Sequence, residues 1–121
     1  MIHQVATRLK DLHAAGFVHR DLKPANIMWL PRENRWTIID FGCVARVGEV
    51  ASTGFSIGYA APEVIRAYRN KENWLAVSEA LDAWSLGVIS YELMTGEKGV
   101  DMRRGADPVS HPIPSQQVNV E

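Results

Sequence analysis

Three things are scarce in this sequence: cysteine, net charge and long apolar runs. The single cysteine, Cys43, excludes a disulfide within the chain, which is typical of a reducing compartment. The 121 residues carry a formal net charge of −1, so electrostatics favour neither nucleic acid nor an anionic membrane as a partner. No apolar run reaches the roughly 18 residues that span a bilayer, and the start of the chain lacks a signal peptide's apolar core. We therefore expect an intracellular protein, with the cytoplasm as its compartment.

What remains is an ordinary globular composition, 46% hydrophobic and 22% charged, with a length that suits at most one domain. An apolar stripe at helical spacing predicts an amphipathic helix over residues 2–14, which ends at Gly16. Two short apolar runs, 27–30 and 36–39, flank a polar turn and predict a β-hairpin.

The second half of the chain has a different pattern. Residues 40–63 show little periodicity and predict a long functional loop. Residues 64–77 begin like a helix and then lose that pattern. Residues 78–95 are apolar on nearly every side, which predicts a helix buried in the core. Ser78 is the expected N-cap of this helix, and Gly96 is the expected residue just past its end.

The most informative stretch runs from His19 to Asn26 and reads H-R-D-L-K-P-A-N. It places the carboxylate of Asp21, the ammonium of Lys23 and an amide on one segment, which Pro24 stiffens. Transfer of a phosphoryl group needs these groups, because one orients the attacking hydroxyl, one neutralises phosphate charge and one helps to hold Mg²⁺. The blander interpretation is a surface loop whose aspartate pairs with a neighbouring cation.

Four motifs in order then carry a family resemblance. They are H-R-D with an asparagine five residues after the aspartate, D-F-G at 40–42, A-P-E at 61–63 and D-A-W-S-L-G at 82–87. Together they resemble the catalytic domain of eukaryotic-type serine/threonine protein kinases, from residue 1 to about residue 96. The resemblance implies an α+β, mainly α, kinase-like fold that is an incomplete C-terminal lobe. Its parts are a helix, the catalytic loop, a small hairpin, the activation segment and a buried central helix.

The resemblance also implies the chemistry. Asp21 is the expected catalytic base, and Lys23 is the expected contact to the transferred phosphate, as in the serine/threonine class. Asn26 and Asp40, which the hairpin should bring together, would hold Mg²⁺. The implied cofactors are ATP and Mg²⁺, and the implied partner is a protein substrate that accepts the phosphoryl group on a Ser or Thr hydroxyl.

Residues 40–63 correspond to the activation segment of that family. Ser52 and Thr53 are the expected phosphate acceptors, and Arg20 is the expected cation that receives the phosphate. The resemblance further implies that Ser56 hydrogen-bonds the catalytic aspartate, and that Glu63 pairs with an arginine from a later helix.

Structural support is expected from four residues around these motifs. By resemblance, His19 and Phe41 belong to a hydrophobic spine in the core, and Gly42 completes the motif that follows Asp40. Asp82 begins a buried helix, a costly place for a carboxylate unless it is hydrogen-bonded. The resemblance implies that its partners are backbone amides of the H-R-D loop.

Parts of the kinase pattern are absent from these residues. There is no G-x-G-x-x-G, and only 18 residues precede His19, so we expect the N-terminal lobe to be missing. We expect a partial kinase domain over 1–96 and a flexible polar tail over 97–121. Two interpretations stay open: a fragment of an active kinase, or a catalytically silent kinase-derived binding or scaffold remnant. In both, the isolated chain is expected to be inactive and to bind ATP weakly.

Overall fold

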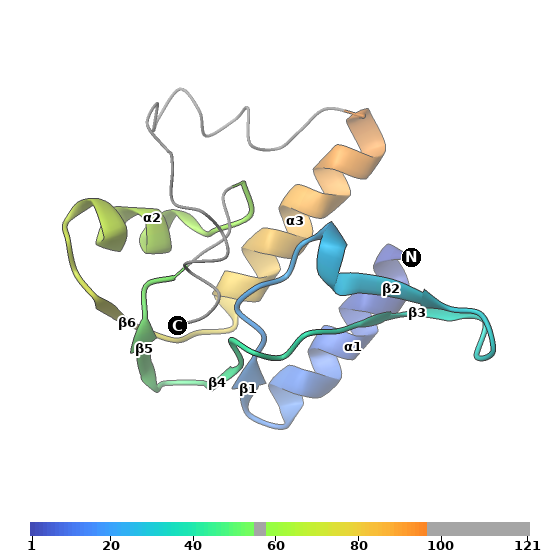
Figure 1. The fold of residues 1–121 in the computed structure, drawn as a ribbon, viewed down its shortest axis with the longest axis horizontal. Coiled ribbons are helices and arrows are strands. Elements are labelled where there is room, and N and C mark those ends of the chain that lie inside the picture. Colours follow the sequence, from blue (N-terminus) through green and yellow to red (C-terminus); the bar gives the residue numbers. More distant parts are fainter. Residues whose placement is uncertain (55–57, 97–121) are drawn as a thin grey trace.

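A computed structural model of the chain describes residues 1–54 and 58–96 (Figure 1). Ser56 and the predicted tail over 97–121 lie outside this range. The described part is α+β, with three α-helices and six short strands that pair as three two-stranded antiparallel sheets. None of the described helices is both long enough and apolar enough to cross a membrane.

The first helix, α1 (Ile2–Ala14), confirms the predicted amphipathic helix, since Val5 and Leu9 on its apolar stripe are buried. Gly16 lies just past its end with a φ of +93°, a conformation that glycine adopts without steric cost. The helix contacts both the hairpin and the long helix α3 (Ala80–Thr95), which lies beside it in Figure 1. The two helices α1 and α3 together pack against the H-R-D loop through Leu22.

The predicted hairpin is present as β2 (Ile27–Leu30) and β3 (Arg35–Ile38). Its second strand begins and ends one residue earlier than expected, because Ile39 leaves the ladder to donate its N–H to the Asn26 carbonyl at 2.8 Å. Ile27 pairs with Ile38 at the end of the hairpin that lies away from its turn. The register therefore brings the end of the catalytic loop next to the residue that precedes Asp40.

The stretch over 40–63 contains more regular structure than its sequence predicts. Strand β4 (Ala45–Arg46) pairs with β1 (Phe17–Val18), which enters the catalytic loop. Strand β5 (Val50–Ser52) pairs with β6 (Trp74–Ala76), which follows the helix α2 (Pro62–Arg69). The expectation of an irregular loop is wrong here, because strands this short leave no alternation to read and gain their order from distant partners.

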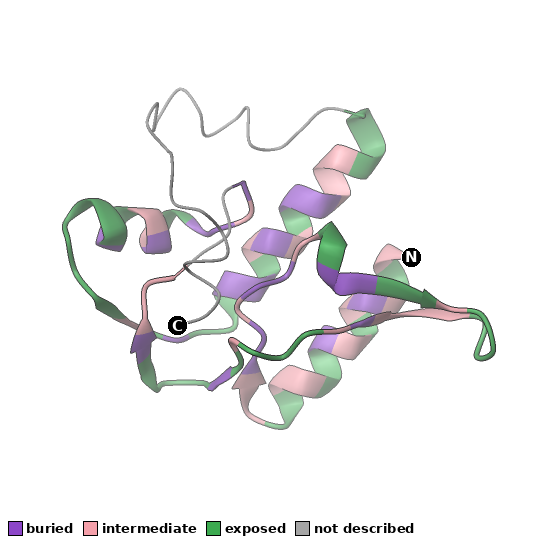
Figure 2. Cartoon of the chain, viewed as in Figure 1, coloured by how far each residue is buried: buried purple, intermediate pink, exposed green. Residues whose placement is uncertain are grey.

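The long helix α3 corrects two expectations. It begins at Ala80 with Glu79 as N-cap, so Ser78 is not the cap; the Ser78 carbonyl instead accepts the Leu81 N–H in the preceding turn. Gly96 ends the helix in the left-handed region, as expected, at a φ of +76°. Figure 2 shows no buried residue in the last turns of the helix: burial ends at Ile89, and Leu93 and Met94 are 57% and 84% exposed. The helix is thus a core element over only part of its length.

Two clusters of buried apolar side chains hold the catalytic loop from both ends. One contains Val18, at the start of the loop, and packs it against residues of the activation segment, α2 and α3. The other contains Leu22, inside the loop, and packs it against α1, the hairpin and Ile89 of α3. Burial of a side chain such as Leu22 contributes about 1.5–3 kcal/mol, so the loop is anchored by the hydrophobic effect as well as by hydrogen bonds.

Candidate active site

The catalytic loop is fastened to α3 through Asp82. Its carboxylate is completely buried and accepts the backbone N–H groups of His19 and Arg20 at 2.8 and 2.9 Å. This arrangement is the one that the resemblance predicts. It also holds Arg20 at a φ of +75°, an unfavourable region for a residue with a side chain. The two amides thereby keep the backbone just before Asp21 in one conformation.

His19 is a core residue, as expected, and links three parts of the site. Its Nδ1 accepts the backbone N–H of Asp21 at 3.1 Å, which leaves Nε2 as the protonated nitrogen of a neutral ring. Nε2 lies 3.0 Å from the Ile39 carbonyl and donates to it. The imidazole therefore joins the backbone of Asp21 to the segment that leads into Asp40.

Asp21, Lys23 and Asn26 lie together. The Asn26 Nδ2 group donates to the Asp21 backbone carbonyl at 2.8 Å and to its carboxylate at 3.3 Å. Lys23 Nζ lies 3.8 Å from the other carboxylate oxygen. Asp21 and Asn26 are both buried, and Lys23 is partly exposed. These contacts use the amino half of the Asn26 amide, which leaves its carbonyl oxygen as the atom suited to a cation.

The D-F-G segment is much more open. Asp40 is exposed, has a φ of +63°, and accepts the Gly42 N–H on its own side chain at 3.2 Å. Phe41 is 48% exposed, so its expected place in the core is wrong for this structure. Its ring contacts the His19 ring edge-on, with centroids 5.2 Å apart.

Arg20 already has partners in the activation segment. Its guanidinium donates to the backbone carbonyls of Cys43, at 3.1 Å, and Ser52. The Thr53 hydroxyl donates to the Glu72 carbonyl. Ser52 is thus bonded to Arg20 through its backbone carbonyl, whereas the Thr53 side chain is bonded to Glu72. Ser56 falls outside the described residues. Glu63 is half-buried in the first turn of α2, where a carboxylate is favoured by the helix dipole.

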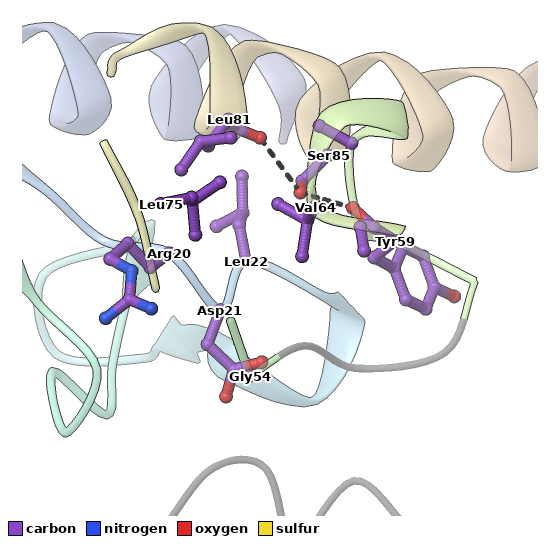
Figure 3. A pocket seen from close by; sticks show the side chains of 11 residues that line it. Arg20, Asp21, Leu22, Gly54, Tyr59, Val64, Leu75, Leu81 and Ser85 are labelled. Atoms are coloured by element: carbon purple, nitrogen blue, oxygen red, sulfur yellow. Dashed lines mark hydrogen bonds between the residues drawn. The ribbon is translucent and has the colours of Figure 1, made fainter. Parts of the chain in front are cut away.

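A small pocket of about 20 Å³ lies beneath Asp21, with room for about one water molecule. Figure 3 shows its wall of apolar side chains, including Leu22, Val64 and Leu81, with the carboxylate of Asp21 directed away from them. The apolar wall packs against the loop on one side, and the Asp21 carboxylate points away from it.

The two side chains expected to hold Mg²⁺, those of Asn26 and Asp40, belong to neighbouring segments, since the Asn26 backbone carbonyl accepts the N–H of Ile39, which precedes Asp40. An amide oxygen and a carboxylate are the donor types that Mg²⁺ takes, and this ion uses few protein ligands besides water and phosphate. Within residues 1–54 and 58–96, no cluster of three or more His, Cys, Asp or Glu side chains could hold an ion unaided. The donor set therefore fits Mg²⁺ that arrives with a nucleotide.

Sequence reasoning missed two supports. His13, at the end of α1, places Nε2 2.9 Å from the Asp82 carboxylate. Tyr59, just before A-P-E, accepts the Ser85 hydroxyl on its backbone carbonyl and donates its own hydroxyl to Glu92. The only sequence signal for these residues is that they are polar groups on or beside elements predicted to be packed.

Comparison with known proteins gives the family context. The sequence matches the protein kinase domain family over residues 1–118. Human mitogen-activated protein kinases 12 and 13 are each 38% identical over 106 residues, which are 84% of this chain and 27% of the relative. The Drosophila melanogaster mitogen-activated protein kinase p38b is 39% identical over 98 residues, 79% of this chain and 25% of the relative.

A solved structure, that of the Cydia pomonella granulovirus kinase PK-1, superimposes with a TM-score of 0.67 at 30% identity. The match covers 80% of this chain and 34% of that one. The chain spans about a quarter of the length of the curated relatives that it matches.

Proposed function

This chain belongs to the protein kinase domain family, and from that premise we propose that it supplies the catalytic loop of an ATP-dependent protein serine/threonine kinase. The observation that carries the proposal is the Asp82-held loop, in which Asn26 bonds the carboxylate and backbone of Asp21. A loop this constrained costs little to organise at the moment of reaction, and positioning is the main requirement of phosphoryl transfer.

Each residue has one role in this proposal. Asp21 orients the substrate hydroxyl and takes its proton, and Lys23, beside it, faces the transferred phosphate. Asn26 and Asp40 hold Mg²⁺ through their side-chain oxygens. Mg-ATP, when bound, supplies the phosphoryl group and neutralises the charge that develops on it. His19 and Asp82 position the loop without touching the substrate.

The preference for Ser and Thr hydroxyls rests on Lys23, which follows Asp21 by two positions, as in the serine/threonine class that the motifs resemble. The names of the relatives, mitogen-activated protein kinases, are in line with a protein substrate. We also propose an intracellular, cytoplasmic location, since a single cysteine fits a reducing compartment. We also keep Ser52 and Thr53 as the proposed phosphate acceptors. A phosphate there would draw the Arg20 guanidinium from a backbone carbonyl that it now holds.

Transfer of labelled phosphate from Mg-ATP to Ser-, Thr- and Tyr-containing peptides tests the proposal, using the protein that carries this chain. We expect transfer to Ser and Thr, and a roughly 10²–10⁴-fold loss of rate for Asp21→Asn. Asp11→Asn, an exposed change on α1, is the matched control and should keep full activity. An Asp21→Asn variant as active as the unmodified protein would remove Asp21 from the mechanism.

The second candidate, a catalytically silent binding or scaffold remnant, is favoured by one observation. The exposed Asp40 carboxylate is bound locally, by the Gly42 N–H two residues away. Thermal unfolding of the protein that carries this chain separates the two, because a ligand stabilises a fold only if it binds it. The silent candidate predicts that Mg-ATP leaves the melting temperature of that protein unchanged, whereas the kinase candidate predicts a rise. For the isolated 121-residue chain we expect no change on either candidate. A clear Mg²⁺-dependent rise would show nucleotide binding by these residues alone.

A further inference from the structure

His13 is a partly buried polar group for which phosphoryl transfer assigns no role. It lies in the last turn of α1, its side chain is 17% exposed, and its Nε2 lies 2.9 Å from Oδ2 of Asp82. The same oxygen accepts the backbone N–H of His19, while Oδ1 accepts that of Arg20. Because Oδ2 already accepts a backbone N–H, we assign Nε2 as the donor nitrogen of this contact.

We propose that His13 is a positioning residue, which directs the Asp82 carboxylate and through it the conformation of the catalytic loop. The His19 and Arg20 amides connect the loop to Asp82 of α3, but these two bonds do not involve α1. The bond from His13 is the third contact, and it joins α1, the loop and α3 at one carboxylate. The effect of His13 on activity rests on the proposed function, whereas its effect on the conformation of the loop does not.

The geometry explains why this contact reaches the site. Arg20 keeps a left-handed backbone conformation while its N–H binds Oδ1, and Asp21 follows it directly. A carboxylate that turned about its own bond would lose its alignment with one or both amides, and the strained backbone would relax. Loss of His13 should therefore act first on the His19 and Arg20 amides and next on the position of Asp21.

The alternative role for His13 is a basic group that interacts with the C-terminal end of the α1 dipole. Four substitutions separate the two roles. His13→Gln places an amide nitrogen the same number of bonds from Cβ as Nε2, and His13→Asn places it one bond closer. His13→Leu removes the donor, and His13→Lys keeps a cation at the helix end. His3→Leu, an exposed histidine on the same helix, is the control.

Hydrogen exchange of the full 121-residue chain, read amide by amide, is the measurement. We expect the Asn and Leu variants to exchange about tenfold faster at the His19 and Arg20 amides than at the hairpin amides, after normalisation to the unmodified chain. The Gln variant should restore protection and the Lys variant should not, whereas a helix-dipole role predicts protection with Lys. The His3→Leu control should leave the exchange unchanged. If the Leu variant fails to fold, the Gln and Asn pair decides.

Equal acceleration of all amides in the Asn variant would show a merely structural role and overturn the proposal, as would protected His19 and Arg20 amides. In the transfer assay, kcat should fall for Asn and return for Gln, with KM for ATP unchanged. An unmodified protein without transfer activity would overturn the proposed function, yet it would leave the exchange result standing. The two failures are therefore distinguishable.

Discussion

The catalytic loop and the D-F-G segment, which together make up the candidate site, are held in opposite ways. The loop is buried, and Asp21 and Asn26 are tied to each other and to the core through His19. The D-F-G segment is exposed, and the carboxylate of Asp40 accepts a bond from Gly42, two residues away. The loop, the buried half of the site, is thus held by hydrogen bonds to other parts of the fold, whereas the D-F-G segment exposes its side chains to solvent.

The difference teaches where the stability of the site resides. A buried polar group must be satisfied, so the loop can exist only with its partners in place. An exposed group is satisfied by water and has no such requirement. Substitutions of the buried residues that hold the loop should therefore cost more stability than substitutions in the D-F-G segment.

The largest effect is expected from Asp82→Leu, which would break the buried half. Two buried backbone donors lose their acceptor, and each unpaired donor costs about 1–3 kcal/mol. We expect a loss of about 2–6 kcal/mol in the free energy of unfolding, measured by urea denaturation of the full chain. Asp11→Leu, which removes an exposed ion pair with Arg8, is the control and should cost less than about 1 kcal/mol. Equal losses in the two variants would contradict the comparison.

Arg20→Leu extends the test to the activation segment. It removes the side-chain donors to the Cys43 and Ser52 carbonyls but keeps the backbone bond to Asp82. We expect a cost of about 1–3 kcal/mol, since partly buried carbonyls lose a charged donor. Faster hydrogen exchange should be confined to β4 and β5. Exchange that rises instead in α1 would place the effect of Arg20 elsewhere.

Phe41→Ala should have a smaller effect, because the ring touches the buried half at one edge only. The contact with the His19 ring is worth about 0.5–1.5 kcal/mol beyond area burial. The change in unfolding free energy should lie in that range. A loss comparable to a core deletion, about 3–5 kcal/mol, would show that Phe41 is covered in solution.

Asp40→Asn should have the smallest effect on stability, within about 0.5 kcal/mol, since the side chain is exposed and its bond is local. The same change should abolish Mg²⁺-dependent transfer if Asp40 holds the ion. Paired measurements of unfolding and transfer on one preparation make this test. Stability and activity lost together would mean that Asp40 belongs to the buried half.

Much of the fold and of the site could be predicted from the sequence, for identifiable reasons. The α1 stripe and the hairpin follow from local spacing, and the hairpin in turn places Asn26 beside the residue before Asp40. Asp82 could be predicted as a hydrogen-bonded carboxylate because it stands at the start of an apolar helix. The kinase fold followed from motifs, and the family match confirms it.

The rest depends on contacts that a linear pattern does not contain. The β5–β6 pair joins short segments from either side of α2, so neither segment predicts its partner. His13 lies 69 positions from Asp82, and only the tertiary fold brings them together. The exposure of Leu93 and Phe41 likewise depends on which elements cover them. The metal-binding and phosphate-acceptor roles stay predictions.

The distance along the chain between the loop and its anchor sets an order of events during synthesis. The His19 and Arg20 amides leave the ribosome 63 and 62 residues ahead of the carboxylate that holds them. Until α3 has been made and docked, these donors lack the Asp82 carboxylate, and His13 of α1 lacks it too. The machinery for chemistry is thus translated early but assembled late. A nascent chain stalled before residue 82 should therefore carry every group of the H-R-D motif without its working geometry.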